Sequence, residues 1–161
     1  MNIILCGFMG CGKTTVGKAL AEMLSMDFVD TDEMIENEQG TTISIIFSEH
    51  GEEYFRQLER LTCEKLGKSD GKVIATGGGA LTFEQNVKAL KENGKIIFLD
   101  ADFETLCDRV GNAETRPLFR NREKAKELYN TRKEKYQNAC DIKIDACGEI
   151  NEVAKRIINS I

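Results

Sequence analysis

The chain has 161 residues, of which 41% are hydrophobic and 30% are charged, and its net charge at pH 7 is −5. This composition fits one domain over residues 1–161, and the negative charge argues against a nucleic-acid partner, which favours a basic face. No apolar stretch approaches the roughly 20 residues that span a bilayer, and the first apolar run is not preceded by the basic residues of a signal peptide. We therefore expect a cytoplasmic protein that does not bind membranes, and we also expect it to be a monomer.

Short β-branched or aromatic runs alternate with stretches of helical periodicity. The predicted strands are Ile3–Cys6, Phe28–Val29, Val73–Ala75, Ile96–Leu99 and Ile142–Ile144. The predicted helices are Lys13–Leu24, Asp32–Glu38, a short turn capped by Thr42 and running to Phe47, Glu52–Leu66, Phe83–Lys91, Phe103–Val110, Arg122–Asn138 and Glu149–Ile158. This alternation predicts an α/β fold with a parallel sheet and helices on both faces.

A glycine-rich loop, Gly7–Thr14, follows the first strand and fits the phosphate-binding pattern G-x-x-x-x-G-K-[ST]. Its glycines allow successive N–H groups to point inward, and the helix N-terminus behind it adds partial positive charge. Lys13 is expected to reach the β- and γ-phosphates and the Thr14 hydroxyl to bind Mg²⁺. The alternative is a glycine-rich turn that only joins strand to helix.

Two carboxylates, Asp30 and Asp32, follow the second predicted strand. The carboxyl ends of strands in an open parallel sheet line the ligand crevice. One carboxylate is suited to holding Mg²⁺ through water and the other to orienting or deprotonating a hydroxyl acceptor. The competing interpretation is a helix cap with acidic residues in the first turn.

The third predicted strand runs into Gly77–Gly79, and three consecutive glycines carry a large entropy cost. Close approach of a ligand to the backbone explains that cost, whereas the alternative is a loose connection.

Arg56 lies on a predicted helix with Glu53 and Glu59. It is either a surface cation paired on its own helix or a guanidinium fork for a carboxylate or phosphate.

An irregular stretch, 111–122, carries the only proline, Pro117, and several arginines, and it contains few large apolar residues. This composition is typical of a mobile flap, so we expect a lid at about 111–122. Arg109 precedes this stretch, Arg116 lies inside it, and Arg132 lies on the helix behind it.

Other chemistries are disfavoured. A guanine-nucleotide switch needs N-K-x-D, which is absent, and the D-x-x-G at Asp145–Gly148 lies far from the loop, where we expect a turn into the last helix. A single histidine, His50, argues against a Ser-His-Asp mechanism. The six cysteines form no C-x-x-C pair and are interpreted as reduced, small hydrophobic residues.

Five motifs in this order and spacing resemble the shikimate kinase family over nearly the whole chain: Gly7–Thr15, D-T-D at 30–32, F-R-x-x-E at 55–59, G-G-G at 77–79 and R-P-L at 116–118. The resemblance implies a three-layer α/β/α P-loop kinase with a five-stranded parallel sheet of the nucleoside-monophosphate-kinase type. It implies transfer of the ATP γ-phosphate to the 3-hydroxyl of shikimate, a step of aromatic amino-acid (chorismate) biosynthesis, with Mg²⁺ as cofactor. It also implies a substrate-binding segment at about 31–62.

The resemblance further implies a role for individual residues. The catalytic residues would be Lys13, Asp32 and Arg116. The ATP site would comprise Gly10, Cys11, Gly12, Lys13, Thr14, Thr15, Arg109 beside adenine, and Arg116 on the γ-phosphate. Mg²⁺ would be held by Thr14 and, through water, by Asp30. The shikimate site would comprise Asp32 as orienting base, Arg56 and Arg132 on the carboxylate, Glu59 behind Arg56, and Gly77, Gly78 and Gly79.

The chain departs from the family pattern at Arg132–Tyr136, which reads R-K-E-K-Y where many members have R-x-P-L-Y, and at Asp145–Glu149, which lacks the arginine or proline often found near adenine. The rival interpretations are a related kinase acting on gluconate or a nucleotide, and an NTP-dependent switch. A neutral polyol does not explain Arg56 together with Arg132. A nucleotide acceptor favours a larger segment than 34–68 provides.

Overall fold

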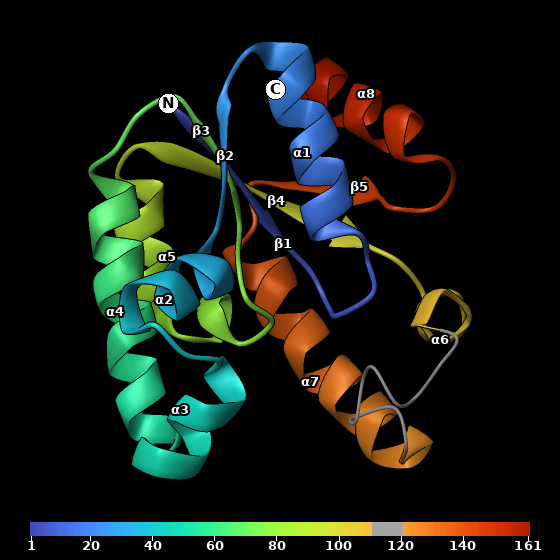
Figure 1. The fold of residues 1–161 in the computed structure, drawn as a ribbon. Coiled ribbons are helices and arrows are strands. Elements are labelled where there is room, and N and C mark those ends of the chain that lie inside the picture. The colour runs from blue at the N-terminus through green and yellow to red at the C-terminus, as the bar shows by residue number, and fades with distance from the viewer. Residues whose placement is uncertain (111–120) are drawn as a thin grey trace.

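The computed structural model describes residues 1–110 and 121–161 (Figure 1). The strands are β1 (Asn2–Cys6), β2 (Asp27–Asp30), β3 (Lys72–Ala75), β4 (Gly94–Asp100) and β5 (Ile142–Asp145). The helices are α1 (Lys13–Leu24), α2 (Thr31–Gln39), α3 (Ile43–His50), α4 (Glu52–Gly67), the 3₁₀ turn η1 (Ala80–Thr82), α5 (Glu84–Lys91), α6 (Phe103–Val110), α7 (Arg122–Ala139) and α8 (Ile150–Ser160).

The five strands form one parallel sheet in the order β2-β3-β1-β4-β5. Helices α1 and α8 pack together on one face, while α4, α5 and α7 cover the other (Figure 1). All five residues of the central strand β1 are buried, as expected for a strand covered on both faces. The predicted α/β class and the five-stranded parallel sheet are therefore confirmed. Within the described residues, no helix is long and apolar enough to cross a membrane.

The strand order brings three of the predicted motifs together at the carboxyl ends of the strands. Leu5 of β1 pairs with Ala75 of β3, and Asp30 of β2 pairs with the same Ala75. The glycine-rich loop, the D-T-D segment and the glycine triplet leave the sheet directly after these residues. The carboxyl ends of β1, β2 and β3 therefore meet at a single crevice, as the topology of open parallel sheets requires.

Element boundaries differ from the predictions where polar residues continue a strand. The run Ile96–Leu99 underestimates β4, because Gly94 and Lys95 already pair with β1. The predicted turn ending at Phe47 is a helix that continues to His50, and the turn η1 was not predicted.

Helices α2, α3 and α4 share a small core of their own, made by Ile35, Ile46 and Phe55 with Ile43 and Leu58 packed against them. This cluster is separate from the main core around the sheet. Hydrophobic contact thus holds the three helices as one unit beside the crevice, in the part of the chain predicted to bind the acceptor.

Candidate active site

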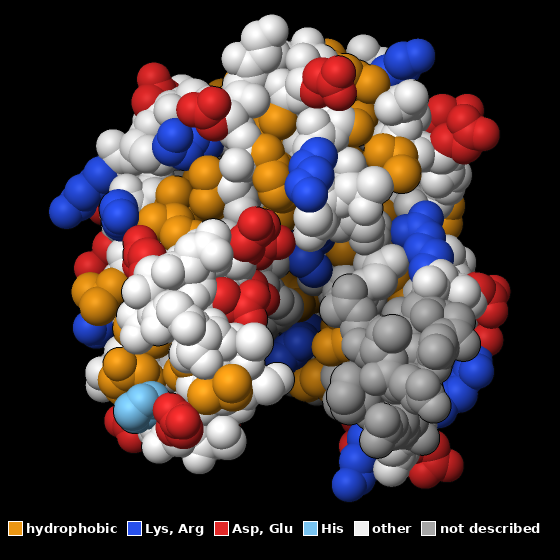
Figure 2. Space-filling view, in the orientation of Figure 1, with side chains coloured by type: hydrophobic (Ala, Val, Ile, Leu, Met, Phe, Trp, Pro, Cys, Tyr) orange, Lys and Arg blue, Asp and Glu red, His pale blue; other side chains and the backbone are white. Residues whose placement is uncertain are grey.

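A cleft of about 760 Å³ lies at the carboxyl ends of the central strands. Acidic and basic side chains meet in this hollow (Figure 2). Most of the predicted site residues line the cleft: Gly10, Gly12, Lys13, Thr14, Thr15, Asp30, Asp32, Arg56, Glu59, Gly77, Gly78, Gly79 and Arg132. Cys11 and Arg109 are not among the lining residues, and Arg116 lies outside the described residues.

The glycine-rich loop forms one side of the cleft. Gly10 and Gly12 adopt φ angles of 86° and 94°, which side chains disfavour. The Lys13 ammonium follows the inside of the loop and donates to the Gly7 carbonyl at 2.6 Å. The N-cap residue of α1 is Gly12, which offers no side-chain acceptor to the first backbone N–H groups of this helix. Such a terminus binds anionic phosphate oxygens.

Cys11 and Arg109 lie at the edge of this loop. The Cys11 side chain is 1% exposed, and its backbone N–H donates to the Phe8 carbonyl at 3.2 Å. The Arg109 guanidinium donates to the Cys11 carbonyl at 3.1 Å and to the Ala146 carbonyl. Arg109 therefore connects the glycine-rich loop to the turn after β5.

Asp30 links the loop to α2. One of its oxygens, Oδ1, accepts from the N–H groups of Asp32 at 2.9 Å and Glu33 at 3.2 Å, which makes Asp30 the N-cap of α2. Its other oxygen, Oδ2, accepts from the Thr14 hydroxyl at 3.2 Å. A carboxylate and a hydroxyl side by side are the hard oxygen ligands that Mg²⁺ prefers. The helix-cap interpretation of Asp30 is therefore confirmed, whereas its role toward Mg²⁺ stays a prediction.

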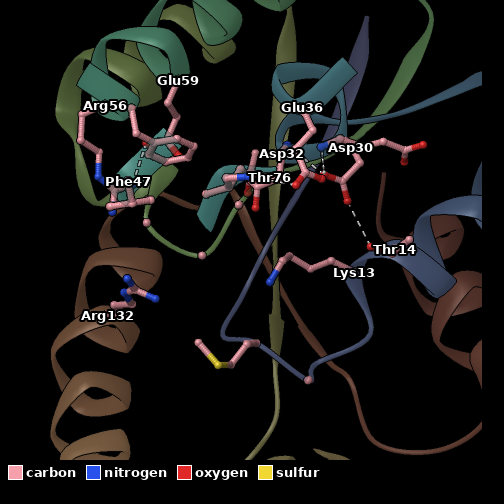
Figure 3. A pocket seen from close by; sticks show the side chains of 18 of the residues that line it. Lys13, Thr14, Asp30, Asp32, Glu36, Phe47, Arg56, Glu59, Thr76 and Arg132 are labelled. Carbon is pink, nitrogen blue, oxygen red and sulfur yellow. Dashed lines mark hydrogen bonds and ion pairs between the residues drawn. The ribbon is translucent and has the colours of Figure 1, made fainter. Parts of the chain in front are cut away.

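Asp32 stands between the two halves of the cleft (Figure 3). Its Oδ1 atom is buried and has no hydrogen-bond partner among the described residues. The pKa of Asp32 is raised to about 6, chiefly by burial and also by the charges of Asp30 and Glu36, while Lys13 and Arg56 oppose the shift. A carboxylate that lines the cleft and has a pKa of about 6 is suited to take a hydrogen bond and a proton from a hydroxyl.

Arg56 and Glu59 form a pair on the other side of the cleft. Arg56 Nη1 donates to Glu59 Oε1 at 2.8 Å, and its Nη2 lies 3.4 Å from Glu52 Oε1. Glu59 is 1% exposed, and its burial raises the pKa of its carboxyl while Arg56 lowers it. The buried Nε of Arg56 has no acceptor within the part of the chain that the structure describes. Arg56 is thus held by its own helix and still carries a free donor.

The glycine triplet brings the functional side chains together. A Cβ atom on Gly77 would lie 2.5 Å from Asp32 Oδ1, and one on Gly79 would lie 2.6 Å from Arg56 Nη1. On Gly78 it would lie 3.0 Å from Arg132 Nη1. Each glycine therefore leaves room for one predicted acceptor-binding side chain, in addition to the ligand approach that the sequence suggested.

Hydrogen bonds fix this backbone segment in place. The Thr31 hydroxyl accepts from the Gly77 N–H at 3.0 Å, and the Thr76 hydroxyl donates to the Leu5 carbonyl at 2.9 Å. The Tyr136 hydroxyl of α7 donates to the Gly78 carbonyl. Contacts from α2, β1 and α7 thus converge on the triplet, so a loose connection, the alternative weighed from the sequence, is wrong.

The sequence did not indicate several lining residues, among them Glu36, Phe47 and Thr76. Glu36 lies one helical turn after Asp32, a spacing that places both side chains on the same face of α2. The Phe47 ring packs against that of Phe55 at 5.0 Å between centroids and forms an apolar wall. No sequence signal pointed to Phe47, because its position depends on how α3 folds back over α4.

Comparison with known proteins agrees with this geometry. A sequence model of the shikimate kinase family matches residues 9–161. The chain is 46% identical to the shikimate kinase of Persephonella marina over 162 residues, covering 97% of this chain and 98% of that protein.

Solved structures give the same result. A shikimate kinase from Acinetobacter baumannii in complex with shikimate superposes with a TM-score of 0.91 at 35% identity, over 99% of this chain and 91% of that one. The shikimate kinase of Aquifex aeolicus gives 0.89 at 37% identity, over 99% and 95%. The chain belongs to the shikimate kinase family and is an ATP-dependent kinase of shikimate.

Proposed function

We propose that this cleft transfers the γ-phosphate of ATP to the 3-hydroxyl of shikimate, with the glycine-rich loop on the nucleotide and Asp32, Arg56 and Arg132 on the acceptor. The observation that carries the proposal is the position of the Asp32 carboxylate, which lines the same cleft as the phosphate loop and the two arginines. Phosphoryl transfer requires alignment and charge neutralisation more than covalent chemistry from the protein, and this arrangement supplies both.

On the nucleotide side, the N–H groups of the loop and of α1 bind the phosphates, and Lys13 leaves its carbonyl partners to meet the β- and γ-phosphates. Thr14 and Asp30 would hold Mg²⁺, Asp30 through water. When bound, the ion neutralises charge on the transferring phosphoryl group. Mg²⁺ keeps several waters and takes few protein ligands, so a hydroxyl and one carboxylate oxygen suit it.

On the acceptor side, the guanidinium groups of Arg56 and Arg132 bind the shikimate carboxylate through charge-assisted hydrogen bonds. Glu59 keeps Arg56 in place from behind. Asp32 accepts a hydrogen bond from the 3-hydroxyl and takes its proton as the phosphoryl group arrives. With its pKa at about 6, Asp32 is mostly ionised at neutral pH and is still a useful base.

The remaining expectations are proposals as well. The action of Arg116 on the γ-phosphate and a lid at about 111–122 fall on residues outside the described part, and both stay predictions. So do the monomeric state and the packing of Arg109 against adenine. All six cysteines are free thiols. This supports the proposed cytoplasmic location, because disulfides persist mainly in oxidising compartments.

A coupled assay of ADP release tests the function. We expect ADP release to require shikimate and Mg²⁺, with no stimulation by gluconate or a nucleoside monophosphate, and to stop when EDTA removes the metal. Asp32→Asn should abolish the stimulation, whereas Asp27→Asn, at the exposed opposite end of β2, should retain it. ADP release that is equal with and without shikimate would refute the proposal.

A further inference from the structure

Helix α7 contacts the glycine triplet through residues on one of its faces. Arg132 and Tyr136 are separated by one helical turn, so both side chains leave the helix in the same direction. Arg132 points from α7 toward the cleft (Figure 3). Between these two residues, Lys135 Nζ lies 3.4 Å from the carbonyl of Thr82 in η1. The position of α7 relative to this backbone segment therefore determines where the Arg132 guanidinium lies.

Tyr136 is the most constrained of these contacts. It is 1% exposed, and its ring packs against Phe98 of β4 at 5.5 Å between centroids. Its hydroxyl donates to the carbonyl of Gly78, 58 residues away along the chain. Burial raises the pKa of this phenol well above its ordinary value, so the group remains a neutral donor. A partly buried carbonyl that loses such a donor is compensated less fully for its lost hydration.

Gly78 lies next to both side chains. A Cβ at this position would lie 3.0 Å from Arg132 Nη1 and 4.0 Å from the Tyr136 hydroxyl oxygen. The Arg132 guanidinium therefore lies close to the place that a side chain at position 78 would take, while the Tyr136 hydroxyl holds the Gly78 carbonyl. A movement of this backbone relative to α7 changes the place of the cation with respect to the acceptor pocket.

We propose that Tyr136 is a positioning residue for the acceptor, because its hydrogen bond to Gly78 fixes the spacing between α7 and the glycine triplet and so places Arg132 on the carboxylate of shikimate. The inference rests on the proposed function. Tyr136 lines none of the cleft itself, and its effect passes through Arg132. Displacements of about 1 Å in such positioning contacts lower catalytic efficiency by as much as about 100-fold.

Tyr129 provides a matched control on the same helix. It lies about two turns before Tyr136, it is 8% exposed, and its hydroxyl also donates to a backbone carbonyl, that of Ala101 at 2.9 Å. Tyr129→Phe and Tyr136→Phe therefore remove the same chemical group, in each case a buried donor to a main-chain oxygen, from one helix. Only Tyr136→Phe removes this hydroxyl next to Arg132.

The experiment measures steady-state kinetics and melting temperature for the two phenylalanine variants. We expect Tyr136→Phe to raise the KM for shikimate by about tenfold, with the KM for ATP unchanged, and Tyr129→Phe to leave both KM values unchanged. Both variants should melt at similar temperatures. In an Arg132→Ala background, Tyr136→Phe should have no further effect on the shikimate KM, because its route to the acceptor is already lost.

Three outcomes overturn the inference: equal rises in both KM values, the same shikimate KM effect from Tyr129→Phe, or an undiminished Tyr136→Phe effect in the Arg132→Ala background. An active wild type with any of these results leaves the proposed function standing. A wild type that shikimate does not stimulate removes the proposed function, and this inference with it.

Discussion

The substitution Asp32→Asn should remove activity and at the same time stabilise the fold. Asp32 has a folded-state pKa of about 6, against an ordinary value of 3.8, chiefly because it is buried and secondly because Asp30 and Glu36 repel its charge. The folded state therefore binds the proton more tightly than the unfolded state does. Ionised Asp32 destabilises the fold above pH 6, and this penalty disappears as the pH falls toward 3.8.

The size of the effect follows from the shift. Two pKa units correspond to about 3 kcal/mol at pH 8 as an upper limit, and to about half of that at pH 5. Asparagine has nearly the same shape and no charge to bury. Since about 1 kcal/mol shifts the melting temperature of a domain of this size by about 2–4 °C, we expect Asp32→Asn to melt several degrees higher than the wild type at pH 8, with a smaller gain at pH 5.

Thermal melts at pH 8 and pH 5, without nucleotide or shikimate, measure the stability, and the ADP-release assay measures kcat. Asp102→Asn is the control, because the Thr105 N–H lowers the pKa of that exposed carboxyl and the stabilising gain should be absent. A melting temperature below that of the wild type, or a gain that does not shrink at pH 5, would refute the account of Asp32 as a buried and repelled charge. A surviving kcat would exclude it as the base.

Four further predictions concern the same cleft. Lys13→Ala should lower kcat by about 10³-fold, because one preorganised donor to the phosphates is lost; near-normal turnover would contradict this. Arg56→Lys keeps a cation beside Glu59 but loses the fork, so the shikimate KM should rise about tenfold while the ATP KM stays constant; parallel changes would give Arg56 another role. Gly77→Ala, which displaces the Asp32 carboxylate, should chiefly lower kcat, and Gly79→Ala, which displaces the Arg56 guanidinium, should chiefly raise the shikimate KM, as steady-state kinetics will show. The kcat/KM for shikimate should fall below pH 6 as Asp32 takes up a proton, and a flat profile from pH 5 to pH 8 would argue against this base.

The sequence predicted correctly the ends of elements that are set by the residues at those ends. Helix α1 has the predicted bounds, Lys13–Leu24, because Gly12 and Ser25 take left-handed conformations at its two ends. The strands begin or end beyond their apolar runs, since hydrogen bonding between neighbours continues through residues such as Asp27 and Lys72. Hydrophobicity marks what a strand buries, whereas its length depends on the partner strand.

The residues of the site also fall into two groups, those that short sequence motifs identified and those that only tertiary packing places. The phosphate loop and the acidic pair are short motifs on one connection each, and the sequence was sufficient to bring them into one hypothesis. Phe47 lines the cleft and Tyr136 holds the Gly78 carbonyl because of where α3 and α7 pack in the folded chain. Contacts over such distances in the chain depend on tertiary packing, which no local periodicity encodes.

The glycine triplet combines a signal that is visible in the sequence with contacts that depend on tertiary packing. Its entropy cost was a local signal, and ligand approach was the predicted reason. In the structure Asp32, Arg132 and Arg56, which come from α2, α7 and α4, lie within 3.0 Å of the positions that the three missing Cβ atoms would take. Since all three side chains lie beside one stretch of backbone, the spacing between the proposed base and the two cations depends on that backbone as well as on the rotamers of long side chains. An added methyl group would therefore move a functional side chain even before any ligand is bound.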